Sequence, residues 1–363
     1  MSRRLEPLLS RGARRSLQSG CKVLSFSAAY VVQIIISYAA GESRKWDAEM
    51  TIPSILAATW RDGLFVFAGE TRRQELAGQA VSALARDQNG GALAIVDGHS
   101  LCRRTCEGAW SAIATSQLDL SCLVVVGDVI YLGTDDARVL RVSENGKIDP
   151  LGGFEAVPGR DRWYAGSALI NGQLFGPPLG VRSMTATSDG AVLLANVHVG
   201  GIPRSTDGGV TWQPTIDIDS DVHEVRAHPV HPGIVIAAAA IGLCISRDGG
   251  ATWTVEQVGL HASYCSAVAF SEKDILVAAA TDHFAIQGAV YRRPIDGKSP
   301  LQPVGGLPGW LGGIADTGCI AALGSALAVA DKAGNLYMSA DAGHSWLHRD
   351  NGLPTMSSVL LIG

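Results

Sequence analysis

Three histidines, His198, His223 and His261, are the residues of this sequence best suited to hold a metal ion. Neutral imidazole is both a common metal ligand and a proton carrier near neutral pH. A zinc site built from them needs the three rings to meet in a tetrahedral arrangement. The sequence therefore offers one candidate site for a divalent metal and predicts no other cofactor. The alternative for His223 is structural: its ring bonds a backbone carbonyl and caps a strand.

A second group of residues could transfer protons. Tyr264, Asp282 and His223 supply a phenol, a carboxylate and an imidazole, the groups used in general acid–base catalysis. We interpret them as candidate catalytic residues of a hydrolase or lyase. Polar side chains are also ordinary in solvated loops, and that interpretation stays open for the same residues.

Several catalytic and binding signatures are absent from the sequence. It has no phosphate-binding glycine-rich loop ahead of a helix, no Gly-x-Ser-x-Gly and no His-Glu-x-x-His. The net charge is −5 and no basic stripe is present, so nucleic acid is not an expected partner. The seven cysteines lack CxxC spacing, which favours buried free thiols over a disulfide framework.

A turn that occurs three times predicts the elements that must position these residues. Its pattern is Ser-x-Asp-x-Gly-x-x-Trp. The glycines allow the positive φ angles of a tight hairpin, and the Asp carboxylate can accept bonds from backbone N–H groups of its own turn. The Trp then anchors the turn by burying its ring. The three copies are Ser205, Asp207, Gly209 and Trp212; Ser246, Asp248, Gly250 and Trp253; and Ser339, Asp341, Gly343 and Trp346.

On these turns the chain resembles the Asp-box, or BNR-repeat, β-propellers. They are a group within the WD40- and YVTN-like propellers that includes sialidases, sortilin-type receptors and a photosystem II assembly factor. The resemblance implies the fold and says little about function, because an Asp box is a structural turn far from the usual ligand face.

The resemblance does not extend to sialidase activity. Sialidases carry Arg-Ile-Pro near their first strand and have six blades, whereas this chain has Ile202-Pro203-Arg204, in a different order and running into an Asp box. No motif assigns Arg61, Arg182, Tyr264 and Asp282 to the roles of the sialidase residues.

The spacing of the turns predicts the number of blades. Trp212 and Trp253 are 41 residues apart, and Trp253 and Trp346 are 93 apart, or two repeats. A period of about 40–50 residues with four short strands is typical of propeller blades. We expect an all-β, seven-bladed β-propeller over residues 50–363, with an insertion at about 154–179. Six blades are continuous, and the seventh combines one C-terminal strand with three N-terminal strands.

This topology places the candidate residues on one face of the ring. Loops between blades and loops between second and third strands share that face, where propellers usually meet ligands. The predicted ligand-binding face comprises Trp60, Arg61, Arg182, His198, His223, His261, Tyr264, Asp282, His283 and Trp310, together with Asp97, His99, Asp135 and Asp221. The insertion adds Arg160, Asp161, Arg162, Trp163 and Tyr164, and we expect it to cover this face as a lid.

Residues 1–49 lie outside the repeats. Several Arg residues precede an apolar run from Val23 to Ala40, an order typical of an export signal. A membrane anchor and a start of translation at Met50 are the alternatives. The propeller is expected in the cytoplasm if translation starts at Met50 and outside it if the leader directs export.

Two functions remain open on the sequence alone. The first is a non-enzymatic binding or scaffolding protein that holds a protein, small molecule or carbohydrate on the His- and aromatic-lined face. The second is a hydrolase or lyase acting on a sugar or small acid at that face, with or without a metal. We expect a monomer whose propeller does not contact a membrane, because a closed ring leaves no sheet edge exposed.

Overall fold

The computed structural model describes residues 53–165, 168–170, 173–175 and 179–363. The predicted leader, residues 1–49, lies outside the described residues. Those residues form strands and short 3₁₀ turns, and none of their helices is long and apolar enough to span a membrane.

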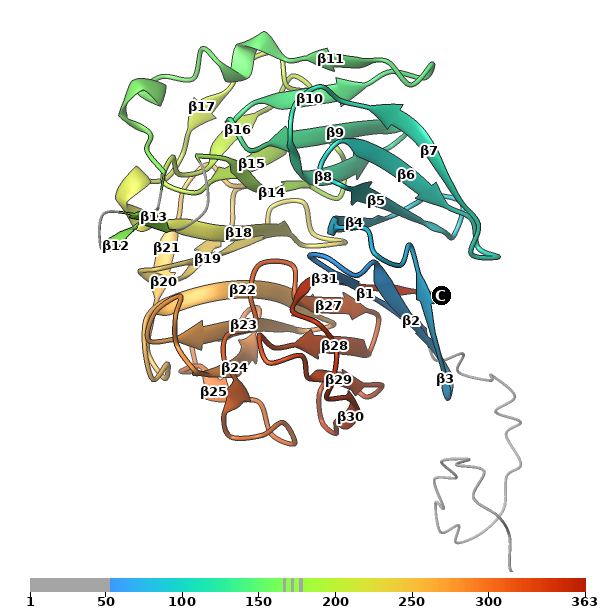
Figure 1. Ribbon diagram of the computed structural model, residues 1–363. Coiled ribbons are helices and arrows are strands. Elements are labelled where there is room, and N and C mark those ends of the chain that lie inside the picture. Colours follow the sequence, from blue (N-terminus) through green and yellow to red (C-terminus); the bar gives the residue numbers. More distant parts are fainter. Residues whose placement is uncertain (1–52, 166–167, 171–172, 176–178) are drawn as a thin grey trace, which may run out of the picture. The chain divides into compact units, whose positions relative to one another are not determined.

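Seven antiparallel sheets form the blades of a β-propeller, which confirms the predicted fold class (Figure 1). Blade 1 contains β31 (Met356–Ile362), β1 (Ser54–Thr59), β2 (Leu64–Ala68) and β3 (Thr71–Glu75). Blade 2 contains β4 (Val81–Arg86), β5 (Ala92–Val96), β6 (Ser100–Arg104) and β7 (Trp110–Thr115). Blade 3 contains β8 (Leu120–Val126), β9 (Val129–Thr134), β10 (Val139–Val142) and β11 (Ile148–Pro150).

The remaining blades follow in chain order. Blade 4 contains β14 (Val181–Ala186), β15 (Leu193–Val197), β16 (Pro203–Ser205) and β17 (Gln213–Pro214). Blade 5 contains β18 (Val222–Ala227), β19 (Val235–Ala239), β20 (Gly242–Ser246) and β21 (Thr254–Glu256). Blade 6 contains β22 (Tyr264–Ser271), β23 (Asp274–Ala280), β24 (Gln287–Pro294) and β25 (Gln302–Pro303), and β26 (Leu311–Gly312) pairs with β24. Blade 7 contains β27 (Ile320–Leu323), β28 (Ala326–Ala330), β29 (Leu336–Ser339) and β30 (Leu347–Asp350).

Three 3₁₀ turns and one small hairpin lie between blades. The turns are η1 (Gly152–Phe154), η2 (Arg160–Arg162) and η3 (Ile218–Ser220), and the hairpin joins β12 (Ala168–Ile170) to β13 (Gln173–Phe175). η2 and the hairpin lie in the insertion predicted at about 154–179, and η1 ends at its first residue.

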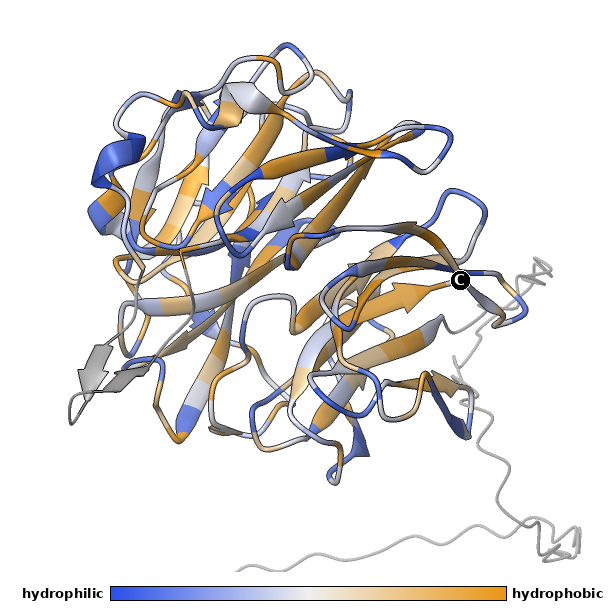
Figure 2. Cartoon of the chain, turned by 45° about the horizontal axis from the view of Figure 1, so that its top comes forward, coloured by the Kyte–Doolittle hydropathy of each residue, from blue (hydrophilic) through white to orange (hydrophobic). Residues whose placement is uncertain are grey.

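The second strand of each blade carries much of the core. Strands β5, β15, β19 and β28 are buried along their whole length, because neighbouring blades cover both of their faces. Outer strands such as β3 are largely exposed and polar. Figure 2 shows the result: apolar residues fill the strands within the blades, and hydrophilic residues gather in the turns.

The two ends of the propeller chain pair with each other to close the ring. Strand β1 runs antiparallel to β31, with Ser54 opposite Ile362 and Ala57 opposite Val359 (Figure 1). This confirms the predicted closure by one C-terminal and three N-terminal strands. The inner strand of every blade also contacts the inner strands of its two neighbours. Closure of this kind leaves no long sheet edge open to other chains.

A β-bulge occurs near the start of six of the seven inner strands. At each bulge one extra residue, which we call the bulge residue, lacks a cross-strand partner. The bulge residues are Ser82, Ser121, Arg182, His223, Ser266 and Ser357.

Side chains at these bulges join one blade to the next. The hydroxyl of Ser121 donates to the carbonyl of Val181 over 2.6 Å, and that of Ser266 donates to Ala315 over 2.6 Å. Ser357 makes the same bond to Val81. The carbonyls of Val181 and Val81 lie on inner strands, and that of Ala315 lies in the loop ahead of β27. Without these bonds they would lose hydrogen-bond partners on burial.

The three repeated turns have the predicted hydrogen bonds. In the first, the Ser205 hydroxyl donates to Asp207 over 2.8 Å and accepts from the N–H of Gly209 over 2.9 Å. The Asp207 carboxylate also accepts from the N–H and hydroxyl of Thr211 over 2.9 and 2.6 Å. Corresponding bonds form around Asp248 and Asp341. The turns are braces of the fold.

The tryptophans of these turns differ in burial. Trp212 is only 2% exposed, and its indole N–H donates to the carbonyl of Gly209 over 2.9 Å. Trp253 and Trp346 are half-buried. The expectation that every Trp of these turns buries its ring is therefore corrected for Trp253 and Trp346. Trp253 precedes β21, which begins at Thr254, and its indole donates to Thr215 over 3.1 Å.

We predict that Trp212→Ala lowers the free energy of unfolding by about 3–5 kcal/mol, the usual cost of removing a buried aromatic side chain. Its ring meets Phe154 edge to face at 5.1 Å, so the variant also removes an aromatic contact. Trp346→Ala, at a half-buried ring, should cost clearly less. Urea denaturation of both variants checks this ordering, and equal losses would contradict it.

We also predict acid sensitivity from the three turn aspartates. Hydrogen bonds from Thr211 and Thr252 lower the pKa of Asp207 and Asp248 to about 2. For Asp341, burial raises the pKa, but bonds from Ser345 and Ser339 outweigh it and bring the pKa to about 2. In the unfolded chain these groups take up protons near pH 3.8, so their stabilising effect is complete above that pH and is lost as the pH falls toward 2.

The measurement is the free energy of unfolding from pH 6 to pH 2, for the natural chain and for a variant with Asn at all three positions. The Asn variant should be less stable at pH 6 and should lose less stability on acidification. Parallel curves would show that these aspartates do not cause the pH dependence.

Candidate functional site

The candidate site lies on the face of the ring where the inner strands begin, which we call the entry face. Because neighbouring strands of a blade are antiparallel, the start of a first strand adjoins the end of a second strand. Val222, at the start of β18, thus pairs with Ala239 at the end of β19. Loops between blades and loops between second and third strands therefore meet at this face.

Seven residues of blades 4 to 7 gather there, and we call them the entry-face cluster. They are Arg182, His198, Asp221, His223, Tyr264, Asp316 and Thr317. The rings of His223 and Tyr264 are 4.5 Å apart between centroids, and those of His198 and His223 are 5.9 Å apart. Four separate blades or their connecting loops thus supply one set of polar groups.

Arg182 links blade 4 to the loop ahead of blade 7. Its Nη2 donates to the hydroxyl of Thr317 over 3.1 Å and lies 3.4 Å from Oδ1 of Asp316. The Thr317 hydroxyl donates in turn to the backbone carbonyl of His223 over 3.1 Å. Burial raises the pKa of Asp316, but the Arg182 guanidinium outweighs it and lowers that pKa overall. The pair is ionised at neutral pH.

His198, Asp221 and His223 converge on one point. Oδ1 of Asp221 lies 3.4 Å from Nε2 of His198 and 3.6 Å from Nε2 of His223. Nδ1 of His223 lies 2.6 Å from the carbonyl oxygen of Cys265. Because a carbonyl only accepts, Nδ1 carries a proton, and Nε2 at the other side of the ring faces Asp221.

His223 therefore bonds a backbone carbonyl, as the structural interpretation expected, and its second ring nitrogen makes no hydrogen bond to a described residue. Like the bulge serines, His223 bonds the carbonyl at the bulge of the next blade. Unlike a serine, it retains a second polar atom that points into the cluster.

The backbone of Asp221 is held in an uncommon conformation. The residue ends η3 with φ 47° and ψ 72°, in the left-handed region. An L residue other than glycine pays about 1–2 kcal/mol for this conformation, and Asp and Asn tolerate it best. Such strain is concentrated at functional sites, where the surrounding structure maintains it.

Burial and nearby charges set the protonation of the cluster. Burial, followed by the charge of Arg182, lowers the pKa of His198, so its ring is neutral at neutral pH. Burial raises the pKa of Asp221, but contacts with His223, His198 and Arg182 outweigh it and keep the carboxyl ionised. Burial also raises the pKa of Tyr264, so its phenol stays protonated. The cluster thus offers neutral imidazole, carboxylates and hydrogen-bond donors.

His261 lies apart from the converging atoms of His198 and His223. Its Nδ1 is 2.7 Å from the hydroxyl of Tyr291, and its ring meets Trp310 edge to face at 4.9 Å. The structure therefore places Asp221 where the sequence suggested His261 as the third partner of the two histidines.

The predicted acid–base residue Asp282 stabilises its own loop. Its carboxylate accepts from the N–H of Phe284 over 2.7 Å and from the hydroxyl of Thr281 over 3.2 Å. His283 is half-buried beside it, and its carbonyl accepts from Lys332 over 3.3 Å. Asp282 is exposed, which agrees with the alternative interpretation of it as a polar residue in a solvated loop.

Other predicted face residues lie on the same side but in other blades. Trp60 and Arg61 are exposed in the β1–β2 loop, and Trp310 is 47% exposed ahead of β26. Asp97 accepts from the N–H of Ala80 over 2.8 Å, which ties the β5–β6 turn to the segment ahead of β4. The remaining two positions are His99, 3.4 Å from Asp119, and Asp135, which is exposed.

The start of the insertion belongs to the core. Trp163 is 7% exposed and packs on the buried ring of Phe154 at 5.7 Å. Arg160 lies 4.8 Å over the Trp163 ring, while Asp161 and Arg162 are exposed in η2. Tyr164 is exposed, and its N–H donates over 3.2 Å to the carbonyl of Val199, next to His198. Residues 154–163 thus support blade 4, and the lid expected there stays a prediction for the rest of the insertion.

Two members of the cluster, Asp316 and Thr317, were not predicted. Both lie in the loop that leads into β27, a position equivalent to the other blade entries. A search of every blade entry for polar residues would have found them.

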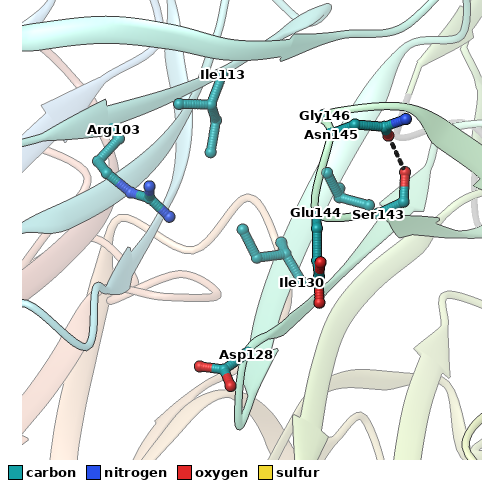
Figure 3. Close-up of a pocket in the computed structure, with 9 residues that line it drawn as sticks. Arg103, Ile113, Asp128, Ile130, Ser143, Glu144, Asn145 and Gly146 are labelled. Atoms are coloured by element: carbon teal, nitrogen blue, oxygen red, sulfur yellow. Dashed lines mark hydrogen bonds between the residues drawn. The ribbon is translucent and has the colours of Figure 1, made fainter.

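A groove of about 530 Å³ lies elsewhere, between blades 2 and 3 (Figure 3). It is lined by Arg103, Ile113, Asp128, Ile130, Val142, Ser143, Glu144, Asn145 and Gly146. The turns that line it join β8 to β9 and β10 to β11, so it opens at the end of the blades opposite the entry face. The Ser143 hydroxyl donates to Asn145 within its own turn over 2.7 Å. Hairpin geometry accounts for this groove, and we do not place the site there.

Comparison with solved structures shows the fold. The GH74 enzyme of Niastella koreensis is similar with a TM-score of 0.55 and 13% identity, over 81% of this chain and 46% of that chain. The GH74 xyloglucanase of Xanthomonas campestris gives 0.52 and 17%, over 82% and 46%. The computationally designed Ika8 protein gives 0.51 and 13%, over 87% and 95%. No family model and no curated protein matches the sequence.

These likenesses support a propeller family and no more. The chain spans about half the length of each GH74 chain, and identity below 20% carries no residue from those enzymes to this one.

We predict that Asp221→Gly leaves the protein more stable than Asp221→Ala by about 1 kcal/mol, because only glycine adopts the left-handed conformation without strain. Both variants lack the carboxylate, so their difference isolates the backbone. Urea denaturation measures it. Equal stability would show that the loop relaxes and that Asp221 is not strained.

Proposed function

We propose that this chain is a non-enzymatic binding propeller whose entry-face cluster holds a small polar ligand, a sugar or a sugar acid. The observation that carries the proposal is the position of Arg182, which reaches from blade 4 to Asp316 and Thr317 ahead of blade 7. Among the described residues, its recorded hydrogen bonds come from Nη2 alone, so Nε and Nη1 remain to bind a ligand oxygen. Arginine is well suited to carboxylates because its donors form a planar fork.

Comparison with other blades supports a role for Arg182 beyond the fold. Serine is the bulge residue in four blades and joins neighbouring inner strands in three of them. Arg182 makes no such bond, and the carbonyl it would meet, that of Val222, accepts from the side chain of Asn196 over 2.7 Å instead. Asn196 thus supplies the interblade hydrogen bond in place of Arg182, and the Arg182 guanidinium can serve recognition.

The cluster combines the groups that a polyhydroxylated ligand needs. Asp221 and Asp316 accept hydrogen bonds, while Arg182 and the protonated Tyr264 donate them. Tyr264 adds aromatic surface next to His223. Small-molecule sites typically pair a few convergent polar groups with aromatic side chains in this way.

A hydrolase at the same site is the second candidate. Asp221 stays ionised next to two imidazoles, which suits a general base for water. The raised pKa of Tyr264 disfavours it as a nucleophile or base, so this hydrolase would differ from a sialidase. The GH74 likeness agrees with such an activity at the level of fold only. The finer assignment to the Asp-box propellers rests on the three repeated turns.

The binding proposal is tested by a thermal-shift screen of residues 50–363 against neutral sugars, sugar acids and other small carboxylates. A ligand at a hundredfold excess over its Kd should stabilise the protein by about 2.7 kcal/mol. Arg182→Ser, which introduces the residue found at four other bulges, should fold and abolish the shift. Arg61→Ser, an exposed arginine on the same face, should retain it. A shift that survives Arg182→Ser would place the ligand elsewhere, and no shift with any compound would overturn the proposal.

The hydrolase alternative is tested by release of reducing sugar from oligosaccharides that bind. Turnover that Asp221→Asn abolishes while the thermal shift persists would establish it. Binding without turnover would favour the binding protein.

A further inference from the structure

We propose that His198, Asp221 and His223 bind one divalent transition-metal ion, of which Zn²⁺ fits best, through Nε2, Oδ1 and Nε2 respectively. This inference concerns the same cluster as the proposed ligand site but rests on its own geometry. It holds whether or not a sugar binds beside it.

The distances between the three atoms fit shared coordination better than hydrogen bonding. Oδ1 of Asp221 is 3.4 Å from Nε2 of His198 and 3.6 Å from Nε2 of His223, and all three atoms lie within 4.8 Å of one another. Hydrogen bonds between such groups are usually 2.7–3.2 Å long. Two ligand atoms about 2.0–2.1 Å from a tetrahedral zinc ion lie roughly 3.3 Å apart, close to the observed separations.

Unpaired buried atoms point independently to a missing partner. Nε2 of His223 and Oδ1 of Asp221 are both buried without a hydrogen bond to any described residue, and His223 is only 1% exposed. Leaving such an atom unpaired costs about 1–3 kcal/mol, more when it is charged. A cation at the point where the three atoms converge would satisfy both.

His223 is also oriented in the way metal-bound histidines are. Its Nδ1 donates to the carbonyl of Cys265 over 2.6 Å, which fixes the ring and directs Nε2 toward Asp221. Outer-shell bonds of this kind accompany most histidine ligands and set both tautomer and basicity. In this chain the carbonyl belongs to the bulge of β22, so the propeller scaffold itself supplies the outer shell.

The ligand set selects the class of metal. Two imidazoles and one carboxylate suit Zn²⁺ and its neighbours in the first transition row, whereas Mg²⁺ and Ca²⁺ prefer oxygen ligands alone. Three protein ligands leave a fourth position of a tetrahedral ion for water or a ligand. Arg182, the cation of the cluster, pairs with Asp316.

The test uses the propeller, residues 50–363, freed of metal with a chelator and then dialysed. Isothermal titration with ZnCl₂ should show one site per chain, and MgCl₂ should show none. Co²⁺ should bind at the same stoichiometry and give the intense visible absorption of a tetrahedral site.

Asp221→Asn and His198→Gln are the decisive variants, because Asn preserves shape at Asp221 and Gln retains polarity at His198. Both should keep the circular dichroism spectrum and lose the saturable zinc site. His261→Gln, which alters an exposed histidine of the same face, is the matched control and should bind as the natural chain does. Unchanged stoichiometry and Kd in Asp221→Asn, or no zinc binding by the natural chain, would overturn the inference.

Arg182→Ser separates this inference from the proposed function. It should still bind one zinc ion per chain while losing the sugar-dependent thermal shift. A thermal shift without zinc binding would refute the metal site alone, and zinc binding without any sugar shift would refute the proposed ligand alone.

Discussion

The structure depends on how seven inner strands are held together around one ring. Each inner strand pairs on one side with its own blade and has an unpaired edge on the other. A side chain at the β-bulge of one blade donates to a backbone carbonyl of the next, as Ser121, Ser266 and Ser357 do. Further side chains complete the edge, because Ser183 and Thr185 accept from N–H groups of β18, and Glu224 accepts from Val268. Polar side chains therefore tie the blades together where a continuous sheet would use backbone bonds.

The candidate site arises where this arrangement changes. In blades 4 and 5 the bulge residue is not serine but Arg182 or His223. His223 keeps the interblade bond and has a second ring nitrogen that faces the cluster. Arg182 makes no interblade bond to the Val222 carbonyl, because Asn196 donates to it, and the guanidinium reaches Asp316 instead. The bulge position recurs in six blades of a rigid ring, so different side chains at two of these positions can create a site. Because the backbone there is already fixed, the new side chains are held in place at little further entropic cost.

The sequence predicted the architecture closely because the repeated turns are local. A Ser-x-Asp-x-Gly-x-x-Trp turn is completed by its own residues, so its spacing could be converted into blades and a closing strand. The site was less predictable because its contacts join residues from four blades. His198 and His223 were expected to meet, yet their third partner is Asp221, and His261 pairs with Tyr291 instead. Such contacts depend on the conformations and lengths of loops from different blades. The spacing of the repeats, which varies in length, does not specify those conformations.

Serine at a bulge holds the ring together, whereas we propose that Arg182 serves recognition. Denaturant unfolding of Ser266→Ala and Arg182→Ser under identical conditions tests it directly. Ser266→Ala should lose about 1–3 kcal/mol, because it leaves the buried carbonyl of Ala315 without its donor. Arg182→Ser should lose less than Ser266→Ala, because Asn196 already supplies the bond to the Val222 carbonyl and only the ion pair with Asp316 and the hydrogen bond to Thr317 are removed. A loss from Arg182→Ser as large as that from Ser266→Ala would show that Arg182 is part of the scaffold.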